Sequence, residues 1–516
     1  MGGKVRGLGV WRTIPVLLSV ASFAAPSGDL SLVEAVQRQD KDAVRSLLQE
    51  QVDVNAAQPD GATALSWAVQ WDDLETAGHL LRAGADVNAA NAYGVTPLWL
   101  ACMNRSAVMV AKLLDAGADA KAALLRSGET VLMRCAITGN VEAVKSLLAH
   151  GADPNAKETR RGQTALMWAV AGRHSAVARP LIEYRADIHA RSKAGFTPLL
   201  FAAQQGDVDV ARMMLALGAD VNESTPADGS ALVVAAASGH EALSIFLMEK
   251  GADPNAADSN GITALHYAVQ KGLSIVTGVR YTPYGVPPRT APDLVKALLA
   301  RGANPNARIV EDYEEFSRAL DRSPTNMVGA TPFLLAAVAA DAAIMRLLVT
   351  GGADPSLEAK GNTTPLMAAA GAAREATGWD GEEESRALEA VKLAVELGAD
   401  VNAADARGRT AMHAAAFTGG DSIIQFLADK GAKVDVKDKS GQTPWSMAAG
   451  ICPVLNGCGS YAIHRSAADL LLKLGATQLT AEGFSPPPRP SYVPAEGGAE
   501  TTKTPGVGNP AVGQPR

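Results

Sequence analysis

The stretch Gly94-Val95-Thr96-Pro97-Leu98 is the clearest instance of a short motif that recurs along this 516-residue chain. A glycine permits the positive backbone angle of a turn, a threonine can cap a helix, and a proline suits the first helical turn, so the stretch predicts the start of a helix. A threonine or serine begins the motif at steps that are mostly 33 or 34 residues. These positions are Thr63, Thr96, Thr130, Thr164, Thr197, Ser230, Thr263, Thr331, Thr364, Thr410 and Thr443.

A second marker keeps the same phase. Twenty-one residues after many of these threonines comes Gly-Ala-Asp or a close variant, at Gly84, Gly117, Gly151, Gly218, Gly251, Gly352 and Gly431. Before Gly151, the apolar residues Val144, Leu147 and Leu148 share one face of a second helix, which the glycine is placed to end. The two markers therefore predict a repeated unit, in which a hairpin is followed by two antiparallel helices.

This unit resembles the ankyrin repeat, which has a 33-residue period and the pattern Thr-Pro-Leu-His-x-Ala. The best matches are Thr96-Pro97-Leu98, Thr197-Pro198-Leu199, Thr263-Ala264-Leu265-His266-Tyr267-Ala268 and Thr410-Ala411-Met412-His413-Ala414-Ala415. The resemblance implies an all-α repeat solenoid of about 11–12 units including caps. Residues 30–59 would form the N-terminal capping repeat, 60–439 the repeats, and 440–477 a C-terminal capping repeat with a cysteine loop. The resemblance also implies that the His266 and His413 side chains form hydrogen bonds with backbone groups between neighbouring repeats. It implies that His174 and His240 pack at the start of outer helices.

Several positions depart from the pattern. Arg185 and Asn362 stand where the family has a turn glycine, and a left-handed arginine costs roughly 1 kcal/mol relative to glycine. Insertions near 277–291 and 372–386, and a third around Cys452 and Cys458, are expected as loops between the two helices of a unit. A fourth, near 309–327, is expected to project from a hairpin, and it carries the acidic and aromatic stretch Glu311-Asp312-Tyr313-Glu314-Glu315-Phe316.

The two chain ends predict different things. Basic residues precede an apolar run in residues 1–24, which reads as a secretory signal peptide and predicts export to the periplasm or the extracellular space. The run is too short to cross a bilayer, so no stable membrane insertion is expected, although a single-span anchor is the alternative. Residues 478–516 are rich in proline and glycine and are expected to form a disordered tail.

The cysteines, the histidines and the short sequence motifs indicate no catalytic or metal-binding site. In an exported protein, Cys452 and Cys458 are expected to form a disulfide, whereas Cys102 and Cys135 fall in the small-residue stripe of inner helices and are expected as buried thiols. None of the 8 histidines belongs to a metal-binding motif, and no nucleotide-binding or nucleophile motif is present. We expect no metal, no cofactor and no enzymatic activity.

Composition and surface pattern favour protein binding. The net charge of -7 gives no strong positive field for nucleic acid. Aromatic and arginine side chains anchor many interfaces, and here they and a few amides fall at expected hairpin tips and exposed ends of inner helices. The candidate binding residues are Trp71, Tyr93, Asn104, Arg126, Arg160, Arg161, Phe196, Gln204, Arg407 and Phe417. We therefore expect a monomeric, non-enzymatic scaffold that binds an unidentified protein partner. One alternative is an enzyme or small-ligand-binding protein with a site built by the insertions. Another is a chaperone-like factor for an exported protein.

Overall fold

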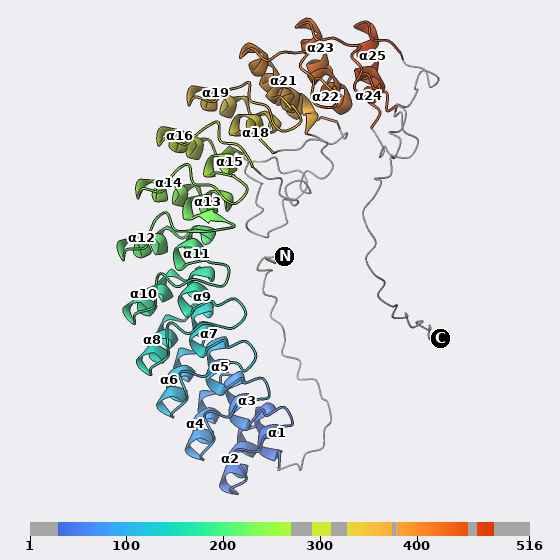
Figure 1. Ribbon diagram of the computed structural model, residues 1–516. Helices are drawn as coiled ribbons and strands as arrows, with labels where there is room; N and C mark the ends of the chain where they lie inside the picture. Colours follow the sequence, from blue (N-terminus) through green and yellow to red (C-terminus); the bar gives the residue numbers. More distant parts are fainter. Residues whose placement is uncertain are drawn as a thin grey trace, which may run out of the picture.

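The protein is a curved solenoid of stacked helix pairs (Figure 1). The computed structural model describes residues 29–269, 291–310, 328–373, 378–379, 381–451 and 462–478. In these ranges twelve helix pairs follow one another, so the predicted all-α repeat solenoid is confirmed. The Cys452 and Cys458 pairing, the expected signal peptide and tail, and most residues of the insertions near 277–291 and 309–327 lie outside the described residues.

The first helix of each pair lies on the concave side of the arc and the second on the convex side (Figure 1). The inner helices are α1 (Ser31–Gln37), α3 (Ala64–Gln70), α5 (Pro97–Met103), α7 (Val131–Thr138), α9 (Ala165–Ala171), α11 (Pro198–Gln205), α13 (Ala231–Ala237), α15 (Ala264–Val269), α18 (Pro332–Val338), α20 (Pro365–Met367) continued by the π-helix η1 (Ala368–Ala372), α22 (Ala411–Thr418) and α24 (Pro444–Ala448). The outer helices are α2 (Lys41–Gln49), α4 (Leu74–Arg82), α6 (Ala107–Asp115), α8 (Val141–Ala149), α10 (Ser175–Glu183), α12 (Val208–Ala216), α14 (Glu241–Glu249), α16 (Pro292–Ala300), α19 (Ala342–Thr350), α21 (Gly381–Glu396), α23 (Asp421–Asp429) and α25 (Arg465–Lys473). Strands β1 (Ser224–Thr225) and β2 (Gly229–Ser230) pair antiparallel in one hairpin.

The threonine motif starts the inner helices as predicted. Thr96 has extended backbone angles, and its side chain accepts a hydrogen bond from the backbone N–H of Trp99 at 3.2 Å. Thr331 does the same for Leu334 at 3.3 Å. Each bond satisfies a donor that the first helical turn would leave unpaired, so the motif determines where the helix begins.

Small side chains let neighbouring inner helices stack closely. Ala101 and Ala169 are fully buried, and each inner helix contacts the inner helices of the adjacent units. A second set of contacts joins the turns, because the asparagine side chain of one unit forms hydrogen bonds with the backbone of the next unit. Asn88, for example, donates to the carbonyl of Gly117 at 3.2 Å and accepts from the N–H of Asp119 at 2.7 Å. The stack is therefore held by apolar packing and by a repeated side-chain-to-backbone bond.

Two sequence predictions about single residues are confirmed, and one about an insertion is wrong in part. Arg185 and Asn362 have φ values of 64° and 61°, which is the left-handed conformation that the missing glycines would adopt.

The insertion near 372–386 was expected as a loop, but Gly381 to Arg386 form the first turns of the outer helix α21. Glu382, Glu383 and Glu384 occupy its first turn, where negative charge is favourable to a helix N-terminus.

Cys102 and Cys135 form a disulfide, which corrects the expectation of two buried thiols. The two residues are 33 apart in sequence, which is one repeat, and stacking brings their Cα atoms to 4.7 Å. Both side chains are fully buried between the inner helices α5 and α7. A sequence separation of one repeat was the available signal for this pairing.

Three of the four histidines with expected structural roles join adjacent repeats as the resemblance implies. His266 instead bonds Thr263 in its own unit, and within the described residues its buried Nε2 has no hydrogen-bond partner. His413 Nδ1 accepts from the N–H of Thr410 at 3.1 Å, which leaves its Nε2–H to donate to the carbonyl of Gln442 in the next unit at 3.2 Å. His174 and His240 similarly reach the carbonyls of Ile137 and Gln204 in the preceding units, both at 3.0 Å. These rings join adjacent repeats.

Candidate protein-binding surface

Four candidate side chains lie on successive hairpin tips of the N-terminal half, and we call Tyr93, Arg126, Arg160 and Arg161 the hairpin-tip patch. The tips are joined by backbone hydrogen bonds, such as Thr159 N–H to the Ser127 carbonyl at 2.7 Å. Lys193 N–H continues the series to the Arg161 carbonyl at 2.7 Å. The chain thus holds side chains from separate repeats in one row.

A buried carboxylate makes the tip with Arg160 and Arg161 rigid. Glu158 is 5% exposed, and its oxygens accept from the backbone N–H groups of Arg160 at 2.6 Å, Arg161 at 2.7 Å and Gln163 at 3.0 Å. Glu158 is therefore used to shape the turn. The guanidinium groups of Arg160 and Arg161 are exposed, and within the described residues neither forms a hydrogen bond or an ion pair. Both groups are available to a partner.

Three of the candidates are aromatic: Tyr93 within this row, Trp71 at the end of α3, and Phe196 just before α11. Tyr93 is 61% exposed and Trp71 is 47% exposed. The ring of Trp71 packs 6.3 Å from that of Trp67, and Phe196 is half-buried with its ring 5.4 Å from Phe201. Rigid aromatic rings with one face covered contribute contact area at low entropic cost, which suits them to an interface.

One group of inner-helix side chains, centred on Arg134, was missed by the sequence reasoning. Arg134, on α7, lies with its guanidinium carbon 4.7 Å from the ring centroid of Trp99 and 5.9 Å from that of Trp168. The carboxylate of Glu129 pairs with it at 2.5 Å. Burial raises the pKa of Glu129, and the Arg134 charge opposes that shift. The available signal was spacing, since Arg134 and Trp168 are one repeat apart at the same inner-helix position.

Two candidates make contacts within the solenoid. The side-chain Nδ2 of Asn104 donates to the carbonyls of Val69 and Gln70 in the preceding unit, at 2.8 and 3.0 Å, so it joins two repeats. That Asn104 binds a partner stays a prediction. Gln204 is half-buried, and its backbone carbonyl accepts the bond from His240.

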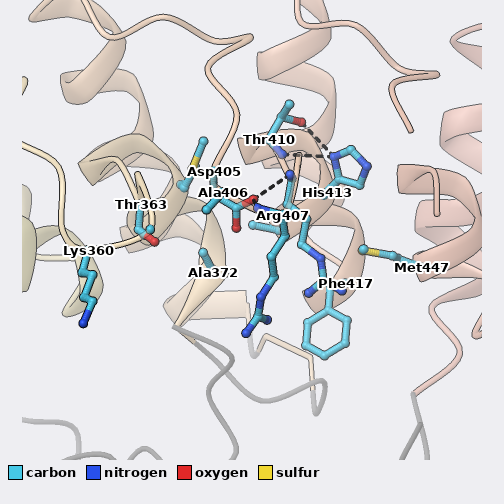
Figure 2. A pocket seen from close by; sticks show the side chains of 14 residues that line it. Lys360, Thr363, Ala372, Asp405, Ala406, Arg407, Thr410, His413, Phe417 and Met447 are labelled. Atoms are coloured by element: carbon cyan, nitrogen blue, oxygen red, sulfur yellow. Dashed lines mark hydrogen bonds between the residues drawn. The ribbon is translucent and has the colours of Figure 1, made fainter. Parts of the chain in front are cut away.

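The remaining two candidates, Arg407 and Phe417, line one pocket in the C-terminal half (Figure 2). This C-terminal pocket has a volume of about 120 Å³. Lys360 and Arg407 lie on two adjacent hairpin tips, and Met367, Phe417 and Met447 come from three successive inner helices. Figure 2 shows Arg407 and Phe417 projecting to the same side. The pocket therefore combines positive charge at the tips with apolar side chains below them.

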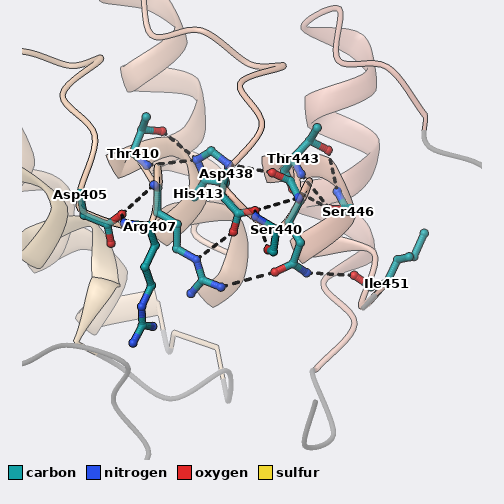
Figure 3. Close-up of polar contacts among 11 residues, drawn as sticks. Asp405, Arg407, Thr410, His413, Asp438, Ser440, Thr443, Ser446 and Ile451 are labelled. Carbon is teal, nitrogen blue, oxygen red and sulfur yellow. Dashed lines mark hydrogen bonds and ion pairs between the residues drawn. The ribbon is translucent and has the colours of Figure 1, made fainter. Parts of the chain in front are cut away.

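A hydrogen-bond network holds the tip of this pocket (Figure 3). Asp405 accepts from the backbone N–H groups of Arg407 and Arg409, both at 2.8 Å. Arg409 pairs with Asp438 at 3.1 Å. Burial would raise the pKa of Asp438, but hydrogen bonds from Ser440, Gln442 and Arg409 outweigh burial and lower it. The carboxylates of Asp405 and Asp438 therefore already have hydrogen-bond partners within the protein. Within the described residues, Lys360 and Arg407 form no ion pair.

The inner helix beside the pocket consists of small residues and is interrupted by a glycine. Residues Ala368–Ala372 read Ala-Ala-Ala-Gly-Ala, and Gly371 has a φ of 106°, which is not helical. A Cβ at Gly371 would lie 2.9 Å from the side chain of Thr418, so only glycine fits there. Ala372, which follows this glycine, lines the pocket.

Among the described residues, no group of three or more histidine, cysteine, aspartate or glutamate side chains is placed to hold a metal ion. The helices in these ranges include none with the length and apolar character needed to span a membrane.

Known proteins are similar to this chain over limited regions. Serine/threonine-protein kinase 12 of Arabidopsis thaliana is 39% identical over 59 residues, which is 11% of this chain and 13% of that protein. The inactive serine/threonine-protein kinase TEX14 of Bos taurus is 33% identical over 103 residues, covering 18% of this chain and 7% of that protein. B-cell lymphoma 3 protein of Homo sapiens is 30% identical over 143 residues, covering 27% of this chain and 28% of that protein. This chain thus aligns with less than a third of the length of each relative.

The family comparison covers more of the chain. A family model described as ankyrin repeats (3 copies) matches residues 15–91, 32–123, 66–158, 132–225, 199–309 and 383–478. The first five ranges overlap, and all six together include more than half of the residues. They cover most of the stacked helix pairs, although α18, α19, α20 and η1 lie between the last two ranges. This chain belongs to the ankyrin-repeat proteins.

Proposed function

We propose that this protein is an exported, non-enzymatic scaffold that binds a protein partner through the concave side of its solenoid. The observation that carries the proposal is the hairpin-tip patch, in which arginine and tyrosine side chains from successive repeats form one row. The tips are held by backbone bonds and by Glu158, so binding would require little ordering of the backbone.

Electrostatics supports a partner with an acidic face. The whole chain has a net charge of -7, yet Arg126, Arg160, Arg161 and Lys193 put exposed positive charge on adjacent tips. Complementary charge raises the association rate and selects the partner. A single protomer carries the whole row, so a monomer suffices.

Two features support export. The N-terminal residues have the pattern of a signal peptide, and the disulfide between Cys102 and Cys135 suits an oxidising compartment. The periplasm and the extracellular space both meet this condition.

The test is a capture experiment with a matched control. Mature protein is compared with a variant in which Tyr93, Arg126, Arg160 and Arg161 are changed to Ala, using the extracytoplasmic fraction of the source cells. The control changes Tyr184, Arg179, Arg346 and Arg465 to Ala, which removes the same residue types from exposed sites at outer helices.

A partner retained by the parent and the control, and lost by the hairpin-tip variant, is the expected result. Circular dichroism and melting curves for all three proteins establish that the variants fold. Equal capture by the three proteins would contradict the hairpin-tip surface, and capture of no protein by the parent would contradict the scaffold function.

A further inference from the structure

We propose that the C-terminal pocket binds an extended acidic segment of a protein partner, with one large apolar side chain of that segment seated against Phe417. This inference rests on the proposed function, since it names the chemistry of a partner and a second place where it binds. Three observations carry it: a row of positive charges, an apolar floor and a cavity of suitable size.

The positive charges come from consecutive hairpin tips. Backbone bonds join these tips in series, from Lys360 N–H to the Val328 carbonyl at 2.6 Å, from Ala406 N–H to the Gly361 carbonyl at 2.7 Å, and from Lys439 N–H to the Arg407 carbonyl at 2.8 Å. Lys360, Arg407 and Lys439 are therefore held one repeat apart along one edge. All three are exposed.

Three nearby carboxylates already accept hydrogen bonds within the protein, and one of them pairs with an arginine. Asp405 is bonded to its own turn, and Asp438 is 6% exposed and paired with Arg409. The side chain of Glu358 accepts from Asn362 at 2.8 Å. Within the described residues, the cations of the row form no ion pair, so carboxylates of a partner would supply the complementary charge.

The floor below the row is apolar. Met367 and Met447 are almost fully buried, Phe417 is half-buried, and all three line the pocket. A cavity of about 150 Å³ holds a benzene molecule in another protein, so the 120 Å³ here suits one aromatic or large aliphatic side chain. Methionine adapts to the shape of such a side chain.

An extended peptide matches the spacing better than a compact ligand. The cations are one repeat apart along the stack, and the apolar site beside them is built around Phe417 by three successive inner helices (Figure 2). Carboxylates at several positions of an extended chain can reach different tips while one side chain enters the pocket.

The probe is a library of random 12-residue peptides displayed on phage. It is selected on the full mature protein and counter-selected on a Lys360→Ala/Arg407→Ala variant. Enriched sequences are synthesised and titrated by fluorescence anisotropy against the parent, this variant, and Phe417→Ala. A Lys433→Ala/Arg179→Ala variant is the control, because it removes two exposed positive charges away from the pocket.

We expect enriched peptides to carry several acidic residues around one aromatic or large aliphatic residue. Loss of Lys360 and Arg407 should weaken binding at least about 30-fold, since two charge-assisted hydrogen bonds disappear. Phe417→Ala should weaken it at least about 10-fold, higher salt should weaken it further, and the control should bind like the parent.

Several results would overturn the inference. These are the absence of any enriched sequence, equal binding of a peptide whose acidic residues are replaced by glutamine, and equal binding by the Lys360→Ala/Arg407→Ala variant. Binding that appears only after residues 311–327 are replaced by a short turn would identify that acidic stretch of this chain as the occupant instead.

The capture experiment separates this inference from the proposed function. A natural partner that the parent and the Lys360→Ala/Arg407→Ala variant retain equally would contradict the pocket and leave the scaffold standing. Peptide binding at the pocket with no partner captured from the extracytoplasmic fraction would contradict the scaffold and leave the pocket standing.

Discussion

Reducing the disulfide between Cys102 and Cys135 should destabilise the N-terminal half of the solenoid by about 4 kcal/mol. The magnitude follows from the separation of 33 residues, because a crosslink removes loop-closure entropy from the unfolded chain in proportion to the logarithm of the loop length. Both sulfur atoms are buried between α5 and α7, so the two thiols of the reduced protein must separate to van der Waals contact within the packed core.

The assay is urea unfolding followed by tryptophan fluorescence, since Trp67, Trp71, Trp99 and Trp168 all lie in this half. Oxidised protein is compared with protein reduced in urea and refolded with reductant present. A Cys452→Ala/Cys458→Ala background removes the other two thiols. The Cys102→Ala/Cys135→Ala variant is the control, because alanine occupies the same two inner-helix positions in other units. The free energy of unfolding of this variant should be the same with and without reductant.

Two results would refute this reasoning. One is a difference below about 1 kcal/mol between oxidised and reduced protein, because typical disulfides contribute 2–4 kcal/mol. The other is alkylation of both Cys102 and Cys135 in unfolded protein that was never reduced, measured by mass spectrometry.

Three further perturbations test the fold. Arg185→Gly should raise the free energy of unfolding by roughly 1 kcal/mol, because it replaces an arginine that is held in the left-handed conformation. The control, Arg179→Gly inside α10, should lower the free energy of unfolding by a similar amount. An unchanged or lower urea midpoint for Arg185→Gly would contradict this explanation. Burial lowers the pKa of His266 from 6.5 to about 4, so the neutral ring is favoured by folding, and the stability present above pH 6.5 should fall by up to roughly 3 kcal/mol as the pH drops to 4. His266→Asn should flatten that part of the urea-midpoint profile, and an equally steep profile in the variant would exclude His266 as the cause. Thr331→Ala should destabilise the protein by about 1 kcal/mol through loss of the cap on α18, while Thr331→Ser should have little effect; equal unfolding free energies for the Ala variant and the parent would count against the cap.

The local elements could be predicted because their causes are local. A threonine that caps a helix three residues on, and a glycine that ends one, act within a single turn, so Thr96 and Gly151 are readable in the sequence. The left-handed backbone of Arg185 followed from its place in the repeat. The helical part of the 372–386 insertion was missed because its length was read as a loop, although three glutamates mark a helix start.

The candidate surface was predictable only in part. The hairpin-tip residues and the pair Arg407 and Phe417 were identified because tip positions recur with the repeat. Asn104 occupies the same kind of position, yet its amide bonds the preceding unit. A sequence does not show whether a polar side chain faces a partner or a neighbouring repeat, since that depends on a distance between units.

The sequence by itself determined the repeat, the start and end of most helices and the stacking of one unit on the next, because each depends on residues within one unit and on a constant period. Tertiary structure alone decided which side chains of different units meet. Stacking brings Cys102 to Cys135, places Arg134 between two tryptophans and brings Lys360 and Met447 of the neighbouring units to the pocket that Phe417 lines. These contacts depend on the distance and rotation between units, which the packing of small side chains determines.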